Sequence, residues 1–201
     1  MDIEMPKILR EKQREVERLE RERIERERLA EVEFRRIKDL HQQRLSGDHS
    51  SKLLDLYQIN SNGTVTDKVL NLTWMRCSLG QFWTGRSCDG EAKKYSWEGA
   101  TQAAQQMRFA DHSNWRLPTI EELKSLVYCS KGVDDKQCAT GSQRPTLFQS
   151  LFPNASATFY WSASPNASSS DYAWGVGFFI GYDYSYRRGD FNRVRLVRGG
   201  Q

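Results

Sequence analysis

The sequence predicts an α+β protein in which a long charged α-helix precedes a domain of two short helices and several short strands. Three observations predict it. Glu and Arg recur three or four residues apart through residues 7–45, where Gly is absent. The remainder holds all six Trp, all eight Tyr and all four Cys. Its apolar residues stand in short runs separated by Gly, Asn and Ser, as in strands joined by turns.

Composition excludes several classes of protein. At 201 residues the chain suits one compact domain with an appendage. No apolar run approaches the roughly 20 residues that span a bilayer, so we expect a soluble protein without membrane insertion. The net charge of +4 is modest and mixed with carboxylates, which argues against nucleic-acid binding. The first residues lack the basic and apolar segments of a signal peptide.

The N-terminal helix has two interpretations. Its charge pairs, each stabilising a helix by about 0.2–0.5 kcal/mol, include Glu17 with Arg21, Glu22 with Arg26 and Glu25 with Arg28. They would support a solitary helix. The apolar residues could instead form a coiled coil, strongest from Leu29 to Leu45, that gathers several copies of the chain, although a strict heptad places Arg23 and Arg26 on its seam.

We expect the helix and its linker to occupy residues 1–48 and the domain residues 49–201, because residues 46–51 are polar and contain Gly. A turn at Asn60-Ser61-Asn62-Gly63 precedes a strand over 64–67, and a second strand follows over 72–76. These segments predict a hairpin at the head of the domain.

The four cysteines form two closely spaced pairs, Cys77 with Cys88 and Cys129 with Cys138. Neither spacing is typical of zinc, so two local disulfides are the favoured interpretation, each contributing about 2–3 kcal/mol. Disulfides favour an oxidising compartment, outside the cytoplasm or at the cell surface. Four reduced thiols in a cytoplasmic protein remain the alternative.

Two helices are predicted inside the domain. Ser96 can cap the first, whose apolar side is Trp97, Ala100, Ala103, Ala104 and Met107. Thr119 and Glu122 form a capping box at the start of the second, and its buried side is Leu123, Leu126 and Val127.

The C-terminal segment is aromatic, with eleven of the 23 aromatic residues between 159 and 191. Over 174–178 the large residues share one parity, which predicts a strand that buries them together. Over 182–190, Tyr alternates with Asp, Ser and Arg, a composition typical of recognition surfaces. The alternative is a hairpin whose Tyr rings only cover the core. A last strand is expected over 194–198.

Several motifs follow one another along the domain: Asn62-Gly63-Thr64-Val65-Thr66-Asp67, Leu72-Thr73-Trp74-Met75-Arg76-Cys77, Gly80-Gln81 with Trp83, Asn114-Trp115-Arg116-Leu117-Pro118-Thr119, Tyr160-Trp161-Ser162 and Val194-Arg195-Leu196-Val197-Arg198-Gly199-Gly200. In this order they resemble the Lcl C-terminal domain family, named for the end domain of a bacterial collagen-like surface adhesin. The resemblance covers about residues 58–201. It extends to the formylglycine-generating-enzyme branch of the C-type lectin fold, which includes variable proteins diversified by retroelements.

The resemblance implies a C-type-lectin-like domain with a small twisted antiparallel sheet and long loops. It also implies trimers and a ligand surface on the hairpin before the last strand. The candidate ligand-binding residues are Tyr172, Phe179, Tyr182, Asp183, Tyr184, Ser185, Tyr186, Arg187, Asp190, Asn192 and Arg193.

We therefore expect a non-enzymatic recognition module without cofactor or metal, of the adhesin or receptor-binding type. Its ligand would be a glycan or polyanion, because Arg187, Arg188, Arg193, Arg195 and Arg198 make the end of the chain basic. A retroelement-diversified module that binds a protein is the alternative.

An enzyme of the formylglycine-generating superfamily is a second alternative. It would need late cysteines for copper, or a His cluster with a carboxylate for iron. The last cysteine here is Cys138, and the three histidines, His41, His49 and His112, are scattered along the chain.

Overall fold

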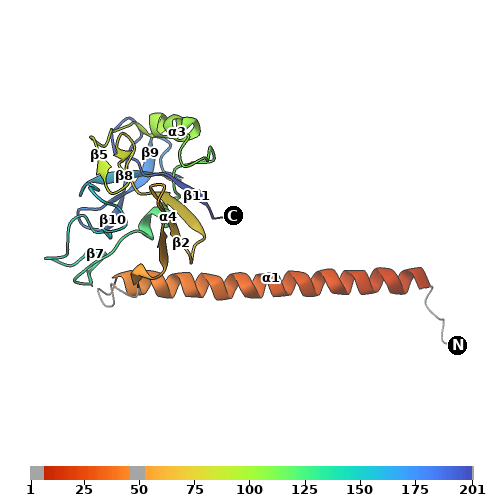
Figure 1. Ribbon diagram of the computed structural model, residues 1–201. Helices are drawn as coiled ribbons and strands as arrows, with labels where there is room; N and C mark the ends of the chain where they lie inside the picture. Colours follow the sequence, from red (N-terminus) through yellow and green to blue (C-terminus); the bar gives the residue numbers. More distant parts are fainter. Residues whose placement is uncertain (1–6, 46–52, 201) are drawn as a thin grey trace. The chain divides into compact units, whose positions relative to one another are not determined.

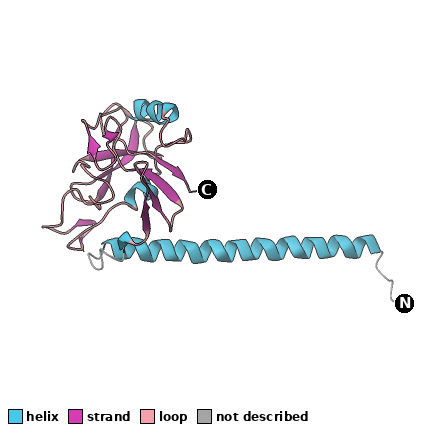
Figure 2. Cartoon of the chain, viewed as in Figure 1, coloured by secondary structure: helices cyan, strands magenta, loops and turns pink. Residues whose placement is uncertain are grey.

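The computed structural model describes residues 7–45 and 53–200 (Figure 1). The chain divides into two units, Met1–Leu40 and His41–Gln201. Most of helix α1 (Lys7–Leu45) belongs to the first unit, and the second holds the sheets and the short helices (Figure 2). Among the described residues no helix is both long and apolar enough to cross a membrane.

Helix α1 is continuous over its 39 residues, as predicted. Exposed ion pairs line it. Arg18 lies between Glu15 and Glu22, at N···O distances of 2.5 and 2.8 Å. Arg23 lies in the same way between Glu20 and Glu27, at N···O distances of 2.6 and 2.7 Å. Each such arginine joins three successive turns, so the helix gains support along its own length.

The predicted ion pairs of α1 form only in part. Glu25 and Arg28 pair at 2.9 Å. Arg21 and Arg26 instead donate their Nε–H groups to main-chain carbonyls four residues earlier, at 3.2 and 3.3 Å. The carboxylate of Glu22 is already bound by another arginine, which explains the difference at Arg26.

The apolar side chains in the described part of α1 are spread around the helix. Val16, Leu19, Ile24, Leu29 and Val32 are 49–64% exposed. A rotation of about 100° per residue places Val16 and Leu19 on one side and Val32 opposite them. The coiled-coil interpretation also depends on four later side chains outside the described residues, Phe34, Ile37, Leu40 and Leu45, and stays a prediction.

The second unit contains two antiparallel sheets. The first has the strand order β1-β2-β3-β11, from β1 (Tyr57–Ile59), β2 (Thr64–Asp67), β3 (Leu72–Met75) and β11 (Val197–Gly199). The second has the order β10-β9-β8, from β8 (Phe159–Pro165), β9 (Tyr172–Gly177) and β10 (Tyr182–Arg187). Two small ladders are β4 (Phe82–Trp83) with β5 (Cys88–Asp89), and β6 (Val133–Asp134) with β7 (Gln137–Cys138). The mixed helix and antiparallel-sheet architecture agrees with the predicted α+β class.

The predicted hairpin is formed by β2 and β3, whose register pairs Val65 with Trp74. Both side chains are fully buried. Strand β11 pairs with the edge of β3 that β2 does not occupy. The last strand of the domain therefore completes the sheet that its first three strands form. The last strand was expected over 194–198 but pairs with β3 only over Val197–Gly199. Just before it, the carbonyls of Val194 and Leu196 accept hydrogen bonds from the N–H groups of Leu79 and Met75, both at 3.0 Å.

Two groups of buried side chains form the core. The first lies around Trp74, Leu123, Leu147, Phe152 and Phe178. The second lies around Ala100, Trp115, Trp161, Ala173 and Leu196. Phe178 and Val176 are buried as the parity of 174–178 predicted, but Trp174 is only half-buried.

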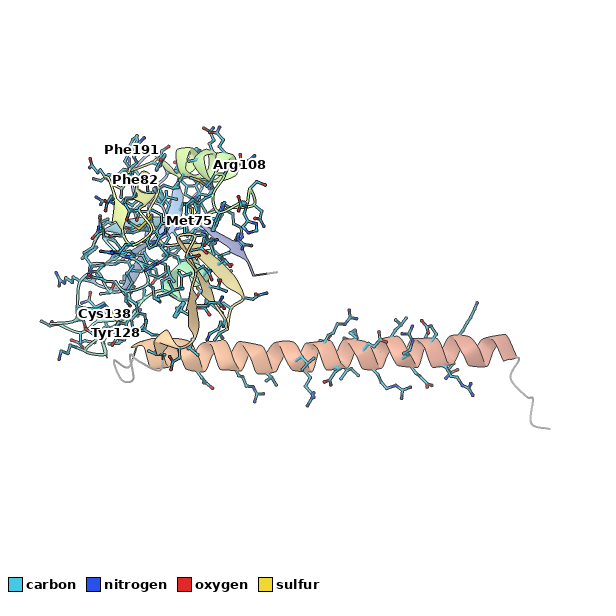
Figure 3. The ribbon with its side chains drawn as sticks, viewed as in Figure 1. Met75, Phe82, Arg108, Tyr128, Cys138 and Phe191 are labelled. Carbon is cyan, nitrogen blue, oxygen red and sulfur yellow. A yellow bond between two sulfur atoms is a disulfide. The ribbon has the colours of Figure 1, made fainter. Side chains whose placement is uncertain are left out.

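Both predicted disulfides form. Cys77 and Cys88 have a Cα–Cα distance of 5.3 Å, and Cys129 and Cys138 one of 4.9 Å (Cys138 is labelled in Figure 3). The first joins the end of β3 to β5, and the second spans the β6–β7 ladder. The described cysteines are thus all oxidised.

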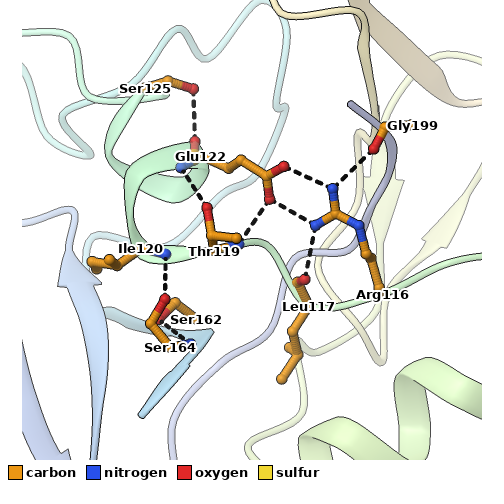
Figure 4. A network of polar contacts seen from close by, with 9 residues as sticks. All are labelled: Arg116, Leu117, Thr119, Ile120, Glu122, Ser125, Ser162, Ser164 and Gly199. Atoms are coloured by element: carbon orange, nitrogen blue, oxygen red, sulfur yellow. Dashed lines mark hydrogen bonds and ion pairs between the residues drawn. The ribbon is translucent and has the colours of Figure 1, made fainter. Parts of the chain in front are cut away.

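The predicted caps are also present. The Ser96 hydroxyl accepts the Gly99 N–H at the start of α3 (Trp97–Gln106), and Thr119 forms the capping box of α4 (Ile120–Lys124). Arg116 donates to both carboxylate oxygens of Glu122 at 2.7 Å and to the Gly199 carbonyl at 2.9 Å (Figure 4). Helix α4 is thereby tied to β11. Leu126 and Val127, expected on its buried side, are buried beyond its last residue.

Candidate ligand-binding site

Among the described residues β10 is an edge strand, because β9 is the only strand beside it in the sheet order. Its register places Tyr182 opposite Gly177, Tyr184 opposite Gly175, and Tyr186 opposite Ala173. Opposed residues in an antiparallel pair point to the same face. Three large rings on β10 therefore stand beside three small residues on β9, so no large β9 side chain separates them from β8.

The rings gather on this face into one cluster, which we call the tyrosine face and define as Phe159, Phe179, Tyr182, Tyr184 and Tyr186. Phe159 of β8 is its centre: its ring centroid lies 4.9 Å from that of Phe179, 5.9 Å from Tyr184 and 4.6 Å from Tyr186. Neighbouring tyrosines on β10 also touch, with centroids 4.8 and 6.2 Å apart. Edge-to-face and tilted contacts dominate, as the charge distribution of aromatic rings favours.

Gly177 makes room for this cluster. A Cβ atom at this position would lie 2.7 Å from a ring carbon of Phe159 and 2.8 Å from one of Phe179. Any other residue would push these two rings away from each other. The aromatic contacts between the outer strands thus depend on glycine in the central strand.

The tyrosine face is partly open to solvent. Tyr184 is 37% exposed, while Tyr182 and Tyr186 are half-buried. Within the described part of the chain the hydroxyls of these three tyrosines have no hydrogen-bond partner. They are therefore available to a ligand, in contrast to the Tyr172 hydroxyl, which accepts a hydrogen bond from Arg187 at 3.2 Å.

Burial raises the pKa of Tyr186 to about 12, with smaller contributions from the neighbouring Tyr184 and Asp190. Tyr186 also packs against the second core group. Its ring is thus anchored by the core, and it presents a neutral ring and hydroxyl across the physiological pH range.

The structure divides the predicted recognition strand between two faces. Asp183, Ser185 and Arg187 alternate with the tyrosines and so point the other way. On that side Asp183 lies 3.5 Å from Lys124 of α4, and Arg187 bonds Tyr172 of β9. The tyrosines and the interleaved polar residues therefore lie on opposite faces of β10, because alternate residues of a strand point to opposite sides. That all of them bind a ligand stays a prediction.

The remaining predicted residues lie beyond β10. Asp190 is exposed in the turn after β10, where its N–H donates to the Arg187 carbonyl at 2.9 Å. Asn192 pairs through its backbone with Tyr95, and Arg193 pairs through its backbone with Tyr160. Arg193 lines a cleft of about 610 Å³ whose other lining residues are Gln81, Cys88, Asp89, Gly90, Glu91, Ala92, Asn154 and Ser156. These three residues do not belong to the tyrosine face.

The arginines that suggested a polyanion site do not form one exposed patch. Arg195 is completely buried and donates to the carbonyls of Met75 and Arg76 at 2.9 and 2.5 Å. Its guanidinium also lies over the Phe152 ring at 4.4 Å, and burial lowers its pKa. It serves the fold and cannot reach a ligand.

Two further arginines cover aromatic rings. The Arg188 guanidinium lies 4.3 Å from the centroid of Trp97, and that of Arg198 lies 5.8 Å from that of Trp115. Only Arg187 among the five is exposed. Sequence proximity grouped these residues, but their side chains leave the backbone in different directions.

A second groove lies beside the start of β10. It has a volume of about 540 Å³ and is bounded by α4, the β6–β7 ladder and residues 181–183. Gly181 is one of its lining residues, and an added Cβ there would lie 2.6 Å from the Cys138 sulfur. The Cys138 N–H also donates to the Ile180 carbonyl at 2.8 Å. The second disulfide therefore sets where β10 begins.

Sequence reasoning missed Phe159 and Trp161, which line the same face from β8. Trp161 is fully buried, and its centroid lies 6.2 Å from that of Tyr186. The sequence did contain a signal for this cluster. Gly175 and Gly177 alternate with larger residues, which is typical of a strand across which side chains of the two adjacent strands can make contact. Among the described residues no group of three or more His, Cys, Asp or Glu side chains could hold a metal ion.

Comparison with known protein families identifies one family for this domain. The model of the Lcl C-terminal domain matches residues 63–198, a span that includes both disulfides and the tyrosine face. A search of curated proteins gave no match. The family match covers more than half of the chain and agrees with the order of motifs from the first hairpin to β11. The chain belongs to the Lcl C-terminal domain family.

Proposed function

We propose that this protein is a non-enzymatic recognition module of C-type-lectin-like fold that binds a glycan on its tyrosine face. The observation that carries the proposal is the cluster itself: three tyrosines on an edge strand, in ring contact with one another, whose hydroxyls have no partner among the described residues. A ring held by its neighbours loses little conformational freedom on binding, so its contact area is gained at low entropic cost.

The chemistry of the face suits sugars. A tyrosine offers a flat apolar ring, against which the C–H groups of a pyranose can pack, and a hydroxyl that can donate to or accept from a sugar hydroxyl. The small residues of β9 on this face, Ala173, Gly175 and Gly177, leave room for the rings of β8 and β10 to meet. Since only Arg187 of the C-terminal arginines is exposed, and it lies on the opposite side of β10, a neutral glycan fits this face better than a polyanion.

A surface protein is the second candidate ligand. Residues 179–193, the segment that includes β10, contain no fully buried side chain. Apart from Gly181 and Tyr186, which pack against Cys138 and the second core group, these residues can therefore change with little effect on the core, as retroelement diversification would require. Tyrosine clusters anchor protein interfaces as well as sugars.

Binding rather than catalysis is supported by the state of the cysteines. All four are held in disulfides, so none is a thiolate that could attack a substrate or bind copper. The same disulfides support a location in an oxidising compartment, at the cell surface or otherwise outside the cytoplasm.

The test compares wild type with Tyr184→Ala and Tyr182→Ala on arrays of immobilised glycans and surface proteins. We expect the wild type to bind a defined set of glycans, and each variant to lose at least tenfold in affinity without a change in melting temperature. Phe191→Ala is the matched control, because Phe191 is 66% exposed (labelled in Figure 3) and is not among the rings in contact with the tyrosine face. Equal binding by wild type and the two tyrosine variants would place the ligand elsewhere.

A further inference from the structure

The outer edge of β10 has no strand beside it in the described part of the chain. The other edge of the same sheet, on β8, is protected. There Trp161 N–H donates to the Arg193 carbonyl at 2.9 Å and Ala163 N–H to the Pro118 carbonyl at 2.6 Å. A register shift before Pro165 also interrupts β8, whereas β10 pairs with β9 over six consecutive residues without a bulge. Regular, uncovered edges are the ones that accept another strand.

The hydrogen bonds of the sheet show which residues of β10 face outward. Arg188 N–H donates to the Asp171 carbonyl at 2.8 Å, in register with the β9–β10 ladder. On the far side of β9, Phe178 N–H donates to the Thr158 carbonyl at 2.9 Å. Because ladder bonds involve alternate residues, even-numbered residues of β10 bond to β9. The backbone groups of Asp183, Ser185 and Arg187 therefore point away from the sheet.

We propose that two copies of this chain associate through β10, edge to edge and antiparallel, about a twofold axis at Ser185. In this register Ser185 faces its own equivalent, and Asp183 of each copy faces Arg187 of the other. All three outward-pointing residues then pair with outward-pointing residues. The Arg187 carbonyl already accepts the Asp190 N–H at 2.9 Å, and its second lone pair is left for the partner strand.

Charge selects this register. Asp183 and Arg187 lie two residues before and two residues after Ser185 on the same side of the strand, so the twofold axis brings opposite charges together twice. Opposite charges directly across an antiparallel pair stabilise it, and like charges destabilise it. An axis at Tyr184 would instead place Asp183 opposite Ser185 and leave Arg187 without an acidic partner.

The pairing would also join the two tyrosine faces. Tyr184 of each copy lies opposite Tyr186 of the other in this register, on the same side of the combined sheet. The result is a six-stranded sheet with one continuous aromatic surface. Self-association is a property separate from the proposed ligand binding, and it is measured without any ligand.

The experiment uses the full chain and two charge-reversed variants, Asp183→Arg and Arg187→Asp. In each variant alone, both cross-strand pairs become repulsive. We expect the pairing step in sedimentation, whether of two single chains or of two α1 trimers, to weaken by roughly tenfold or more. In an equal mixture the two variants are complementary, since one carries two arginines and the other two aspartates. The mixture should associate as strongly as wild type, and so should the double variant carrying both changes.

Ser185→Pro is an independent test of the edge itself. Its N–H points outward, so proline removes no bond to β9 but blocks the partner strand. We expect Ser185→Pro to be folded and unpaired, and Ser185→Ala to pair like wild type. The exposed Arg86→Asp is the control for a change of charge away from the edge.

Three outcomes would overturn the proposal. One is association of the single variants that matches wild type, because it would locate any contact elsewhere, including α1. Another is failure of the mixture to recover association. The third is stronger association when Asp183 and Arg187 are neutralised to Asn and Gln, which would show that these charges keep the edge free of partners.

Discussion

The ring of Phe159 packs on the ring of Tyr186, with centroids 4.6 Å apart, although the two residues belong to the two outer strands of a three-stranded sheet. The contact is possible because the intervening strand presents Ala173, Gly175 and Gly177 on that face. A strand with large side chains there would separate the rings. The small residues of β9 therefore allow the rings of β8 and β10 to contact each other.

Gly177→Ala tests this relationship. The new Cβ overlaps the Phe159 and Phe179 rings, so we expect destabilisation of about 1–3 kcal/mol from overpacking, together with weaker binding at the tyrosine face. Urea unfolding and the glycan array measure the two effects. Gly189→Ala is the control, since a Cβ at that position meets no atom within 4 Å. An unchanged Gly177→Ala protein would show that the cluster does not need the glycine.

Arg195→Ala should be strongly destabilising. The change empties a fully buried site and leaves the carbonyls of Met75 and Arg76 without their donor, which we expect to lower the free energy of unfolding by about 3 kcal/mol. Chemical denaturation measures it. The exposed Arg187 provides the comparison, because Arg187→Ala should change the stability of the folded chain by no more than about 0.5 kcal/mol. Equal effects would contradict the assignment of separate roles.

Acid should release α4 from β11. Burial by itself would raise the pKa of Glu122, but hydrogen bonds from Arg116 and from the Thr119 N–H, with the charge of Arg116, hold it below its usual value. A lowered pKa in the folded state gives stability above the unfolded value of 4.5 that is lost as pH falls through the folded value. We expect melting temperature to fall below about pH 4.5 in wild type, and less steeply in Glu122→Gln.

The two disulfides should differ in their effect on binding. By loop length each contributes about 2–3 kcal/mol to stability, so Cys77→Ser/Cys88→Ser and Cys129→Ser/Cys138→Ser should be destabilised alike. Only Cys138 touches the beginning of β10, through Gly181 and Ile180. Glycan binding at a temperature where both variants are folded should fall in the second variant and persist in the first.

The helix should determine higher assembly. We expect the whole chain to form trimers through α1, and a version that begins near residue 50 to keep only the pairing through β10. Sedimentation of both proteins checks this. A whole chain that sediments like the shorter version would establish α1 as a solitary helix, in keeping with the scattered apolar side chains of its described part.

Local patterns predicted more of this protein than distant contacts did. The α1 helix, the Ser96 and Thr119 caps and both disulfides follow from residues within about a dozen positions of one another, and all are present. The burial of Arg195 could not be predicted from local sequence. Its partners Met75 and Arg76 lie 120 and 119 residues away in the sequence.

The candidate site shows the same limit. The run of alternating tyrosines predicted a strand near the surface, either a recognition surface or a cover for the core. Which residues share a face with it depends on β8 and β9. Phe159 enters the cluster because its strand pairs with β9 at Gly177, a register set by tertiary packing. The split of Asp183 and Arg187 from the tyrosines follows from strand geometry alone and could have been predicted.

The ion pairs of α1 also give the chain a mechanical property. Its 39 residues rise about 1.5 Å each, so the two ends of the helix are held about 58 Å apart. Arg18 and Arg23 brace successive turns whether or not other copies are present, and a coiled coil would be stiffer still. In either state α1 is a rigid rod that keeps its two ends at a fixed distance. A flexible linker of the same length would let the two ends approach each other.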